Sequence, residues 1–316
     1  MLNEKMLNDV AEGLHRIPKT LSSMYFYDEA GSRLFQQIMA LPEYYPTRTE
    51  YSIFEAQSAA LVAALSPPEA SGPFSLVELG AGDGLKTKLL LRALLAMGQA
   101  FTYVPVDISP SAVAGLVASL QQELPGLRVE PLVADYGTAL MALANRPGRK
   151  AVLFLGSNIG NFDPAGRAGF LAQLAAPLGP ADRLLVGFDL QKDPRRIRAA
   201  YDDAQGVTAA FNRNLLTRLN RELRADFALE RWQHYADYEP LTGAVRSFLV
   251  STEAQTVHIE ALDQSFKFAA WEVIHTENSY KFTQPQIAEL AAAAHLRVAA
   301  TFTDVATDFA DVVLAR

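Results

Sequence analysis

The segment FSLVELGAGDG (residues 74–84), followed by KTKLLLRALLAM (residues 86–97), decides the fold of this chain. Its first part is short and apolar, as in a buried strand, and a cluster of glycines separates it from a leucine-rich helical run. A strand, a glycine-rich turn and a helix are the opening step of a doubly wound α/β sheet. We therefore predict that a parallel sheet begins at residue 74.

The same alternation continues after this step. Apolar stretches predict further strands at Phe101–Asp107, Leu127–Val133, Val152–Gly156 and Leu184–Asp189, separated by helical segments. Ser109-Pro110 marks the start of one of these helices, because proline is favoured at the first helical position. Apolar strands separated by helices indicate a mostly parallel sheet that is buried on both faces.

Two more strands are predicted near the C-terminus. Thr283 and Gln286 have the spacing of a capping box at the start of an alanine-rich helix. The apolar stretches Leu296–Phe302 and Asp311–Ala315 follow that helix. Because only a short segment separates them, we expect these two strands to pair antiparallel.

Two other parts of the chain, residues 1–60 and 195–282, are rich in aromatic and polar residues. Tyrosines that lie there include Tyr27, Tyr44, Tyr45, Tyr201, Tyr235, Tyr238 and Tyr280. Their similar composition predicts one discontinuous second domain, a cap built from these two segments; the family resemblance described below implies that it binds the substrate. The sheet domain would then comprise residues 61–194 and 283–316.

Composition narrows the class of protein. Of the 316 residues, 28 are basic and 35 acidic, and the net charge of −7 gives no reason to expect binding to nucleic acid or to an anionic membrane. We expect a small-molecule partner instead. The chain has no cysteine and its five histidines are scattered, so neither a disulfide nor a metal site is predicted.

The start of the chain and its hydropathy bear on location. The first residues lack the basic region and apolar core of a signal peptide. No uncharged apolar run reaches the roughly 18 residues of a spanning helix. We therefore expect a cytoplasmic protein; its oligomeric state stays open, and a monomer is compatible with the sequence.

The glycine cluster can be tested against three nucleotide-binding motifs. The dinucleotide fingerprint fails because Leu85 stands where its last glycine is required, and the phosphate loop fails because Leu85 precedes Lys86-Thr87. The segment Glu78–Gly84 instead resembles the E-x-G-x-G-x-G loop of class I methyltransferases, which use S-adenosyl-L-methionine (SAM). Glycines let the backbone approach that cofactor closely.

Two acidic residues follow the next predicted strands. Asp107 ends the second strand, where a carboxylate can accept hydrogen bonds from ribose hydroxyls, and Asp135 ends the third, where it can accept from an adenine amino group. The alternative is that these acids only cap the helices that follow them.

Four longer blocks carry a more specific resemblance. Residues 26–32 (FYDEAGS), 41–48 (LPEYYPTR), 156–162 (GSNIGNF) and 210–214 (AFNRN) are similar to the histidine-specific methyltransferases of ergothioneine biosynthesis. The resemblance extends from about residue 15 to the end of the chain. It implies a Rossmann-like class I methyltransferase fold and SAM-dependent trimethylation of the α-nitrogen of L-histidine, which gives histidine betaine (hercynine).

The resemblance also implies roles for individual residues. The cofactor would be held by Gly80, Gly82, Lys86, Asp107, Asp135 and Tyr136. The substrate's carboxylate and amino group would contact Tyr27, Asn161 and Tyr201, which are therefore the expected catalytic residues. The rest of the substrate pocket would comprise Tyr44, Glu277 and Ser279 at the imidazole end, Gly156 and Ser247, and the apolar walls Phe35 and Phe211.

One residue departs from the family pattern. Ser247 stands where histidine-specific members usually carry a methionine against the imidazole. Another aromatic amino acid or a histidine derivative is therefore an alternative substrate. Alternatives of another class are a non-catalytic cofactor-binding module and an NAD-dependent oxidoreductase. No residue is identified as a dedicated general base.

Overall fold

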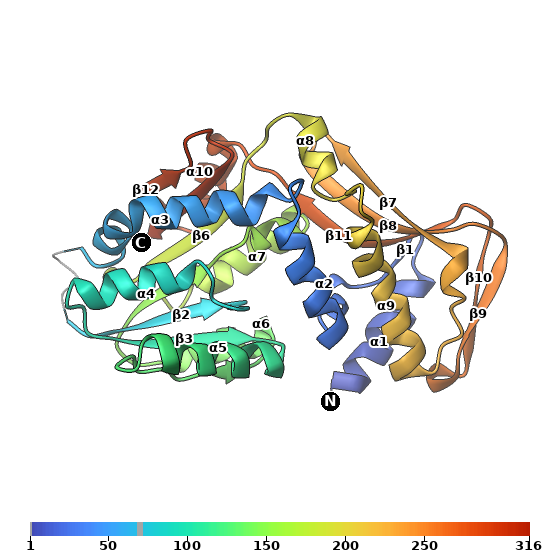
Figure 1. Ribbon diagram of the computed structural model, residues 1–316, viewed down its shortest axis with the longest axis horizontal. Coiled ribbons are helices and arrows are strands. Elements are labelled where there is room, and N and C mark those ends of the chain that lie inside the picture. Colours follow the sequence, from blue (N-terminus) through green and yellow to red (C-terminus); the bar gives the residue numbers. More distant parts are fainter. Residues whose placement is uncertain (1, 68–71) are drawn as a thin grey trace. The chain divides into compact units, whose positions relative to one another are not determined.

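A sheet in the order β12-β13-β6-β5-β2-β3-β4 forms the centre of one of the two units of the chain (Figure 1). The computed structural model describes residues 2–67 and 72–316. Neighbouring strands from β4 to β6 in this order run parallel, whereas β13 runs antiparallel to both β6 and β12. The predicted α/β fold, with a mostly parallel sheet and a final antiparallel pair, is confirmed.

The strands of this sheet are β2 (Phe74–Leu79), β3 (Phe101–Asp107), β4 (Leu132–Val133), β5 (Arg149–Phe154), β6 (Arg183–Asp189), β12 (Arg297–Thr303) and β13 (Phe309–Ala315). The helices of the same unit are α3 (Tyr45–Leu65), α4 (Thr87–Ala96), α5 (Pro110–Glu123), α6 (Tyr136–Asn145), η3 (Asn158–Asn161), α7 (Pro164–Ala175) and α10 (Gln284–Ala293). Every residue of β2, β6 and β13 is buried, because helices cover both faces. α3, α4 and α5 share one hydrophobic cluster with the strands, and α6, α7 and α10 share another.

Several predicted elements match the structure closely. β2 begins at the predicted residue, β3 has the predicted bounds, and α4 lies within the predicted helix. The capping box of Thr283 and Gln286 is present at the start of α10. These elements were predictable because their apolar periodicity and their terminal signals agree.

The predicted strand Leu127–Val133 is wrong over most of its length. Only Leu132–Val133 form β4, and an isolated bridge joins Tyr103 to Val129. Pro131 lies between these two pairings and has no backbone N–H to donate. This segment forms the edge of the sheet, where a proline is tolerated at the expense of a continuous ladder.

The fourth strand also differs from its prediction. It was expected over Val152–Gly156, but β5 begins at Arg149 and ends at Phe154. Gly156 has a φ of +75°, a left-handed conformation that ends the extended backbone. The charged residues at the start of β5 concealed its beginning, because Arg149 stacks on the ring of Phe74 rather than pointing into water.

The second unit contains mixed α and β structure. Its helices are α1 (Leu2–His15), η1 (Ser23–Phe26), α2 (Glu29–Ala40), α8 (Pro194–Ala199), α9 (Val207–Leu223), η4 (Leu229–Arg231) and η5 (Glu260–Leu262). Its strands are β1 (Lys19–Thr20), β7 (Trp232–Glu239), β8 (Ala244–Ser251), β9 (Gln255–Ile259), β10 (Gln264–Phe268) and β11 (Val273–Tyr280). β1, β11, β8 and β7 form one sheet in that order, and β9 pairs with β10. α1, α2 and α9 contribute to its hydrophobic core.

The chain passes between the two units at three points. We call Pro46–Gln191 with Tyr280–Arg316 the sheet unit, and the part up to Tyr45 with Lys192–Ser279 the second unit. Each unit is therefore discontinuous in sequence. The boundary expected between residues 60 and 61 falls inside α3, whose apolar residues belong to the core of the sheet unit. Residues 68–71 of the expected sheet domain lie outside the described part of the chain.

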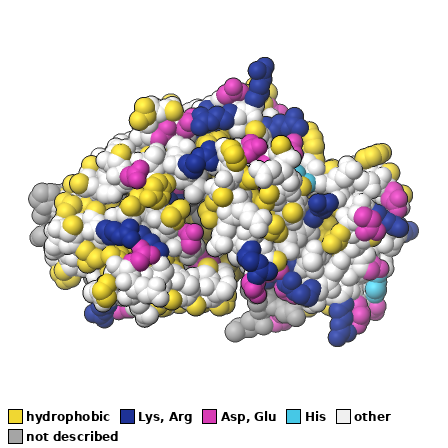
Figure 2. Space-filling model, in the orientation of Figure 1, with side chains coloured by type: hydrophobic (Ala, Val, Ile, Leu, Met, Phe, Trp, Pro, Cys, Tyr) yellow, Lys and Arg dark blue, Asp and Glu magenta, His cyan; other side chains and the backbone are white. Residues whose placement is uncertain are grey.

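The surface and the helices add two observations. Figure 2 shows acidic and basic side chains interspersed over the face in view. None of the helices in the described part of the chain is both long enough and apolar enough to cross a membrane.

Candidate active site

The glycine loop after β2 presents open backbone. Gly80 and Gly82 have φ values of +75° and +54°, which side chains rarely adopt. Gly80 N donates to Val106 O at 2.8 Å, so the loop is tied to the end of β3. A Cβ at Gly82 would meet no other atom within 4 Å, which leaves space beside this residue for a ligand.

Asp107 lies next to this loop at the end of β3. Its Oδ2 accepts the N–H of Gly82 at 2.9 Å, and its Oδ1 accepts the N–H of Ser109 at 2.9 Å. Each carboxylate oxygen has a further lone pair and can accept a second hydrogen bond. The structure therefore brings the two predicted cofactor residues Gly82 and Asp107 together, and this pair fits the ribose hydroxyls of the expected cofactor.

Asp135 and Tyr136 begin α6. Oδ1 of Asp135 accepts the N–H of Thr138 at 2.9 Å, so Asp135 caps this helix, as the alternative interpretation expected. The Tyr136 ring packs against Phe154 and Phe170, at 5.4 Å from each, and burial raises the pKa of its hydroxyl. The cofactor roles of Asp135 and Tyr136 remain predictions.

Lys86 and Gly156 are joined by a residue that the sequence did not reveal. Glu50 of α3 forms an ion pair with Lys86 and accepts the N–H of Gly156, 2.8 Å from its Oε1. Burial lowers the pKa of Lys86, but the charge of Glu50 and the hydrogen bond to it outweigh burial, so the pKa is raised and Lys86 stays charged. Glu50 lies in a polar stretch of the sequence, far from both partners, and no local pattern marks it.

Glu78, the first residue of the glycine motif, faces the protein interior. Its carboxyl group accepts from the Thr87 hydroxyl at 2.6 Å and also from the Tyr103 hydroxyl. Burial raises its pKa to about 7, although both hydrogen bonds and the charge of Lys86 oppose this shift. Glu78 therefore connects β2 to β3 and to the first residue of α4, and it stabilises the glycine loop from the interior of the protein.

In the second unit, five aromatic side chains form a continuous wall. Tyr27 contacts Phe35 and Phe211, with ring centroids 5.6 and 5.7 Å apart. Phe35 contacts Tyr44 at 6.1 Å, and Tyr44 contacts Tyr201 at 6.2 Å. All five were predicted to line the substrate pocket, and the structure brings them together.

The last ring of this wall reaches β11. The Tyr201 hydroxyl and the Ser279 hydroxyl are 2.7 Å apart and buried. Glu277 lies two residues before Ser279 on the same strand and is half-buried. Ser247 of β8 is buried and lies opposite Ala236 of β7, so two small side chains face each other at this point of the sheet.

Tyr201 is held by a histidine to which the sequence analysis gave no role. His234 Nε2 is 2.9 Å from the Tyr201 carbonyl oxygen, and its Nδ1 is 2.8 Å from Asn212 Nδ2. The Tyr201 carbonyl can only accept, so Nε2 donates. The amide nitrogen of Asn212 can only donate, so Nδ1 accepts, and this pair of roles requires the neutral ring. Burial lowers the pKa of His234 and favours this neutral form.

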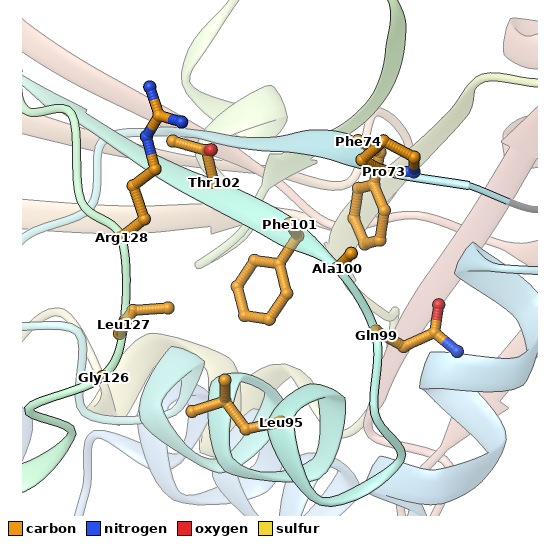
Figure 3. Close-up of a pocket in the computed structure, with 10 residues that line it drawn as sticks. All are labelled: Pro73, Phe74, Leu95, Gln99, Ala100, Phe101, Thr102, Gly126, Leu127 and Arg128. Atoms are coloured by element: carbon orange, nitrogen blue, oxygen red, sulfur yellow. The ribbon is translucent and has the colours of Figure 1, made fainter.

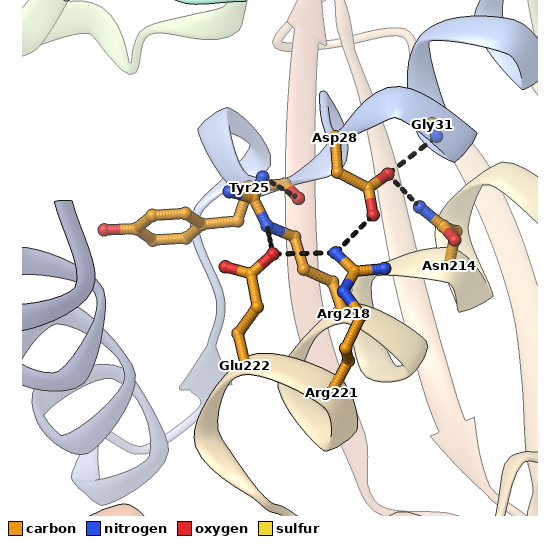
Figure 4. Close-up of polar contacts among 7 residues, drawn as sticks. All are labelled: Tyr25, Asp28, Gly31, Asn214, Arg218, Arg221 and Glu222. Atoms are coloured by element: carbon orange, nitrogen blue, oxygen red, sulfur yellow. Dashed lines mark hydrogen bonds and ion pairs between the residues drawn. The ribbon is translucent and has the colours of Figure 1, made fainter.

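Asp28 joins two of the sequence blocks that carry the family resemblance (Figure 4). Its Oδ1 accepts the N–H of Gly31 at 2.7 Å and the side chain of Asn214 at 2.8 Å, and its Oδ2 accepts Arg221 at 2.7 Å. Burial raises its pKa, but these hydrogen bonds outweigh burial and lower it. Asp28 thus fixes α2 to α9 beside Tyr27.

Asn161 and Gly156 belong to the sheet unit. Gly160 N donates to Ser157 O at 2.8 Å, and a Cβ at Gly160 would lie 2.7 Å from Tyr280 O, so this turn after β5 is closely packed. The turn places Asn161 at the carboxyl end of β5, on the end of the sheet where ligands bind in open α/β folds. Predicted substrate residues in the second unit are Tyr27, Tyr44, Tyr201, Ser247, Glu277 and Ser279.

A pocket of about 350 Å³ lies elsewhere in the sheet unit (Figure 3). It is lined by Phe74 and Phe101 at the amino ends of β2 and β3, and by Arg128 in the segment before β4. Ligands of open α/β sheets bind at the opposite ends of the strands. The candidate cofactor site of the sheet unit is therefore not this pocket but the glycine loop and the residues around it.

Comparisons with known proteins identify the family of this chain. A histidine N-alpha-methyltransferase from Mycolicibacterium smegmatis is 43% identical over 306 residues, which cover 97% of this chain and 93% of the relative. Another from Mycobacterium tuberculosis is 42% identical and covers 95% of this chain and 92% of the relative. Ergothioneine biosynthesis protein 1 of Schizosaccharomyces pombe is 27% identical over 94% of this chain, which corresponds to 39% of that protein.

The family model described as histidine-specific methyltransferase, SAM-dependent, matches residues 6–316. This match includes the glycine loop, Asp107 and every residue of the aromatic wall. The chain therefore belongs to the family of histidine-specific, SAM-dependent methyltransferases.

Proposed function

We propose that this protein transfers methyl groups from SAM to the α-amino nitrogen of L-histidine, three times in succession, to form histidine betaine. The observation that carries the proposal is the family match over residues 6–316. The glycine loop and Asp107 would bind the cofactor, and the aromatic wall would bind the substrate.

The cofactor half of the site would use the ends of the central strands. Gly80 and Gly82 leave room for the nucleoside, Asp107 would accept its ribose hydroxyls, and Asp135 would accept from the adenine amino group. Lys86 would pair with the cofactor's carboxylate, and Tyr136 would also contact the cofactor. SAM supplies an electrophilic methyl group on a sulfonium.

The substrate half would orient the amino acid. Tyr27, Asn161 and Tyr201 would hold the carboxylate and the amino group, and alignment of the nitrogen with the methyl carbon is the main contribution to the rate. Hydroxyl groups can stabilise the neutral amine that the reaction requires. The tyrosine rings of the wall can also favour the growing cationic product through cation–π contacts.

The residues at the imidazole end of the substrate pocket would determine which amino acid is bound. The Glu277 carboxylate would accept an imidazole N–H, next to the hydroxyl groups of Tyr44 and Ser279. Ser247 faces Ala236 across the strand pair, and two small side chains leave more volume than a methionine would. This observation favours a second candidate substrate, a histidine derivative or another aromatic amino acid.

A substrate panel tests the proposal. Purified protein is incubated with SAM and each of histidine, modified histidines, tryptophan and tyrosine, and mass spectrometry detects the addition of one, two or three methyl groups. We expect histidine to gain three. Binding of SAM without methylation of any amino acid would favour a non-catalytic module, and calorimetric binding of NAD rather than SAM would contradict the proposal altogether.

A further inference from the structure

Glu50, a buried carboxylate of α3, links separate parts of the sheet unit. Its side chain is 1% exposed and forms the ion pair with Lys86. The N–H of Gly156 lies 2.8 Å from its Oε1 and 3.1 Å from its Oε2. Glu50 therefore fixes the segment before α4 and the segment after β5 to the same group.

The sheet leaves a place for this carboxylate. Gly187 of β6 is paired in register with Asp311 of β13. A Cβ at Gly187 would lie 2.6 Å from Glu50 Oε1, closer than side-chain carbons come to an oxygen. The Glu50 carboxyl thus lies directly on the sheet, over a glycine and beside Asp311.

Asp311 supplies a second carboxyl group at the same place. It is 0% exposed, and no N–H or O–H donor of the described residues reaches either oxygen. Asp311 is paired with Gly187, where a Cβ would lie 2.6 Å from Glu50 Oε1, so the two carboxyl groups lie close together, and they can bond only when one of them holds a proton. Burial and the charge of Glu50 raise the pKa of Asp311 well above its usual range, so Asp311 holds that proton.

The charges around the cluster lead to the same conclusion. Among the described residues, Lys86 lowers the pKa values of Glu78 and Asp311 by its charge, and Glu50, Asp311 and Glu78 are three buried carboxyl groups near it. Three buried carboxylates against one ammonium would leave uncompensated charge, which is strongly unfavourable in a protein interior. A proton on Asp311 leaves Glu50 as the direct counter-ion of Lys86.

We propose that Glu50 is a positioning residue of the cofactor site. Its carboxylate holds the Lys86 ammonium and the Gly156 N–H in place, while Asp311 keeps its proton and donates a hydrogen bond to Glu50. This inference rests on the proposed role of Lys86. The Lys86 ammonium has three donors, so it can bind Glu50 and still donate to an anionic group of a ligand. A Cβ at Gly156 would lie 3.7 Å from Lys86 Nζ, so the ammonium lies beside this glycine.

Calorimetry with S-adenosylhomocysteine tests the inference without turnover. We expect Glu50→Gln to weaken binding about 10-fold, because a neutral amide holds the ammonium less firmly. Asp311→Asn keeps a donor toward Glu50 and should bind within about 2-fold of the unmodified protein. Asp182→Asn is the matched control, a buried carboxyl 5% exposed at the amino end of β6, and should also bind normally.

The pH dependence gives a second measurement if Glu50→Gln does not fold. As the pH rises, the affinity of the unmodified protein should fall once Asp311, whose pKa is raised by burial, ionises beside Glu50, Lys86 and Glu78, and it should fall less in Asp311→Asn. Ionisation of Lys86 and of the ligand affects both proteins alike, so the difference reports Asp311.

The outcomes separate the two proposals. If the unmodified protein does not bind S-adenosylhomocysteine, the proposed function itself fails. If it binds and folded Glu50→Gln binds equally well, or the two pH profiles coincide, the positioning role of the cluster is wrong. Lower thermal stability of Glu50→Gln with unchanged affinity would likewise overturn it, because the ion pair would then be only structural.

Discussion

The proposed cofactor half, in the sheet unit, and the proposed substrate half, in the second unit, are each held by different forces. In the sheet unit, a buried ion pair and carboxyl groups fix the glycine loop and its neighbours, as in Lys86 with Glu50. In the second unit, ring contacts and neutral hydrogen bonds fix the aromatic wall, as in His234 with Tyr201. The first half should therefore respond to changes of charge and the second to changes of shape and hydroxyl groups.

The largest effect is expected at Asp107. Replacement by Ala removes the acceptor for Gly82 N and Ser109 N together with the proposed ribose contacts. The two proposed hydrogen bonds from the ribose hydroxyls to the Asp107 carboxylate correspond to about 1.5–3 kcal/mol each. Their loss should weaken S-adenosylhomocysteine binding about 100-fold or more in calorimetry. Asp163→Asn, at the exposed N-cap of α7, should leave affinity unchanged. Equal affinity of Asp107→Ala and the unmodified protein would remove Asp107 from the cofactor site.

A smaller effect, confined to the substrate, is expected at Glu277. Glu277→Ala leaves the imidazole N–H without its acceptor, which corresponds to about 1–3 kcal/mol, or roughly a 10- to 100-fold lower kcat/KM for histidine. The affinity for S-adenosylhomocysteine should not change. Steady-state kinetics with histidine measure the first quantity. Unchanged histidine kinetics would dismiss the role of Glu277 in specificity.

Tyr201→Phe tests the neutral half more finely. The substitution keeps the ring contact with Tyr44 but removes the hydroxyl that bonds to Ser279. We expect kcat/KM for histidine to fall about 10-fold, the effect of one or two hydrogen bonds, with little change in the melting temperature. Tyr235→Phe, at a half-exposed ring of the same unit, is the control. A fall in cofactor affinity alone would contradict the assignment of Tyr201 to the substrate.

The smallest expected effect is on stability, at Glu78. Burial raises the pKa of Glu78 to about 7, from an ordinary value of 4.5, so the folded state binds the proton more tightly than the unfolded state does. This contribution to the free energy of unfolding is present below about pH 4.5 and is lost as the pH rises toward about 7. The glutamine in Glu78→Gln does not ionise, so this contribution does not vary with pH in the variant.

Melting temperatures measured across this pH range check the prediction. Subtracting the Glu78→Gln profile from that of the unmodified protein cancels the other carboxyl groups. The difference should fall as the pH rises, by an amount that corresponds to a few degrees at most. A difference that does not vary with pH would mean that Glu78 titrates normally.

The parts that could be predicted from the sequence are those with local signals. β2 and β3 are continuous apolar runs, and the glycine loop between β2 and α4 has its own spacing. Pro131 is also visible in the sequence, but its effect depended on the edge position of β4, which is a property of the whole sheet. The resemblance, rather than any local pattern, indicated the residues of the aromatic wall.

Glu50 and His234 could not be predicted for a physical reason. Glu50 lies 36 residues before Lys86 and far from Asp311 in sequence, and the three meet only when α3 packs on the assembled sheet. His234 acts on a backbone carbonyl, for which no side-chain pattern exists. Groups that support binding residues are thus harder to find in a sequence than the binding residues themselves.

The position of β13 has a consequence for the synthesis of the protein. Phe309–Ala315 follows the other strands of this sheet in the sequence, yet it pairs between β6 and β12 rather than at an edge. Until it emerges, the nascent chain exposes the unpaired backbone of β6, which is a site for aggregation. Chains interrupted before residue 309 should therefore be recognised as unfinished by chaperones and proteases, even though most of the sheet has already been made.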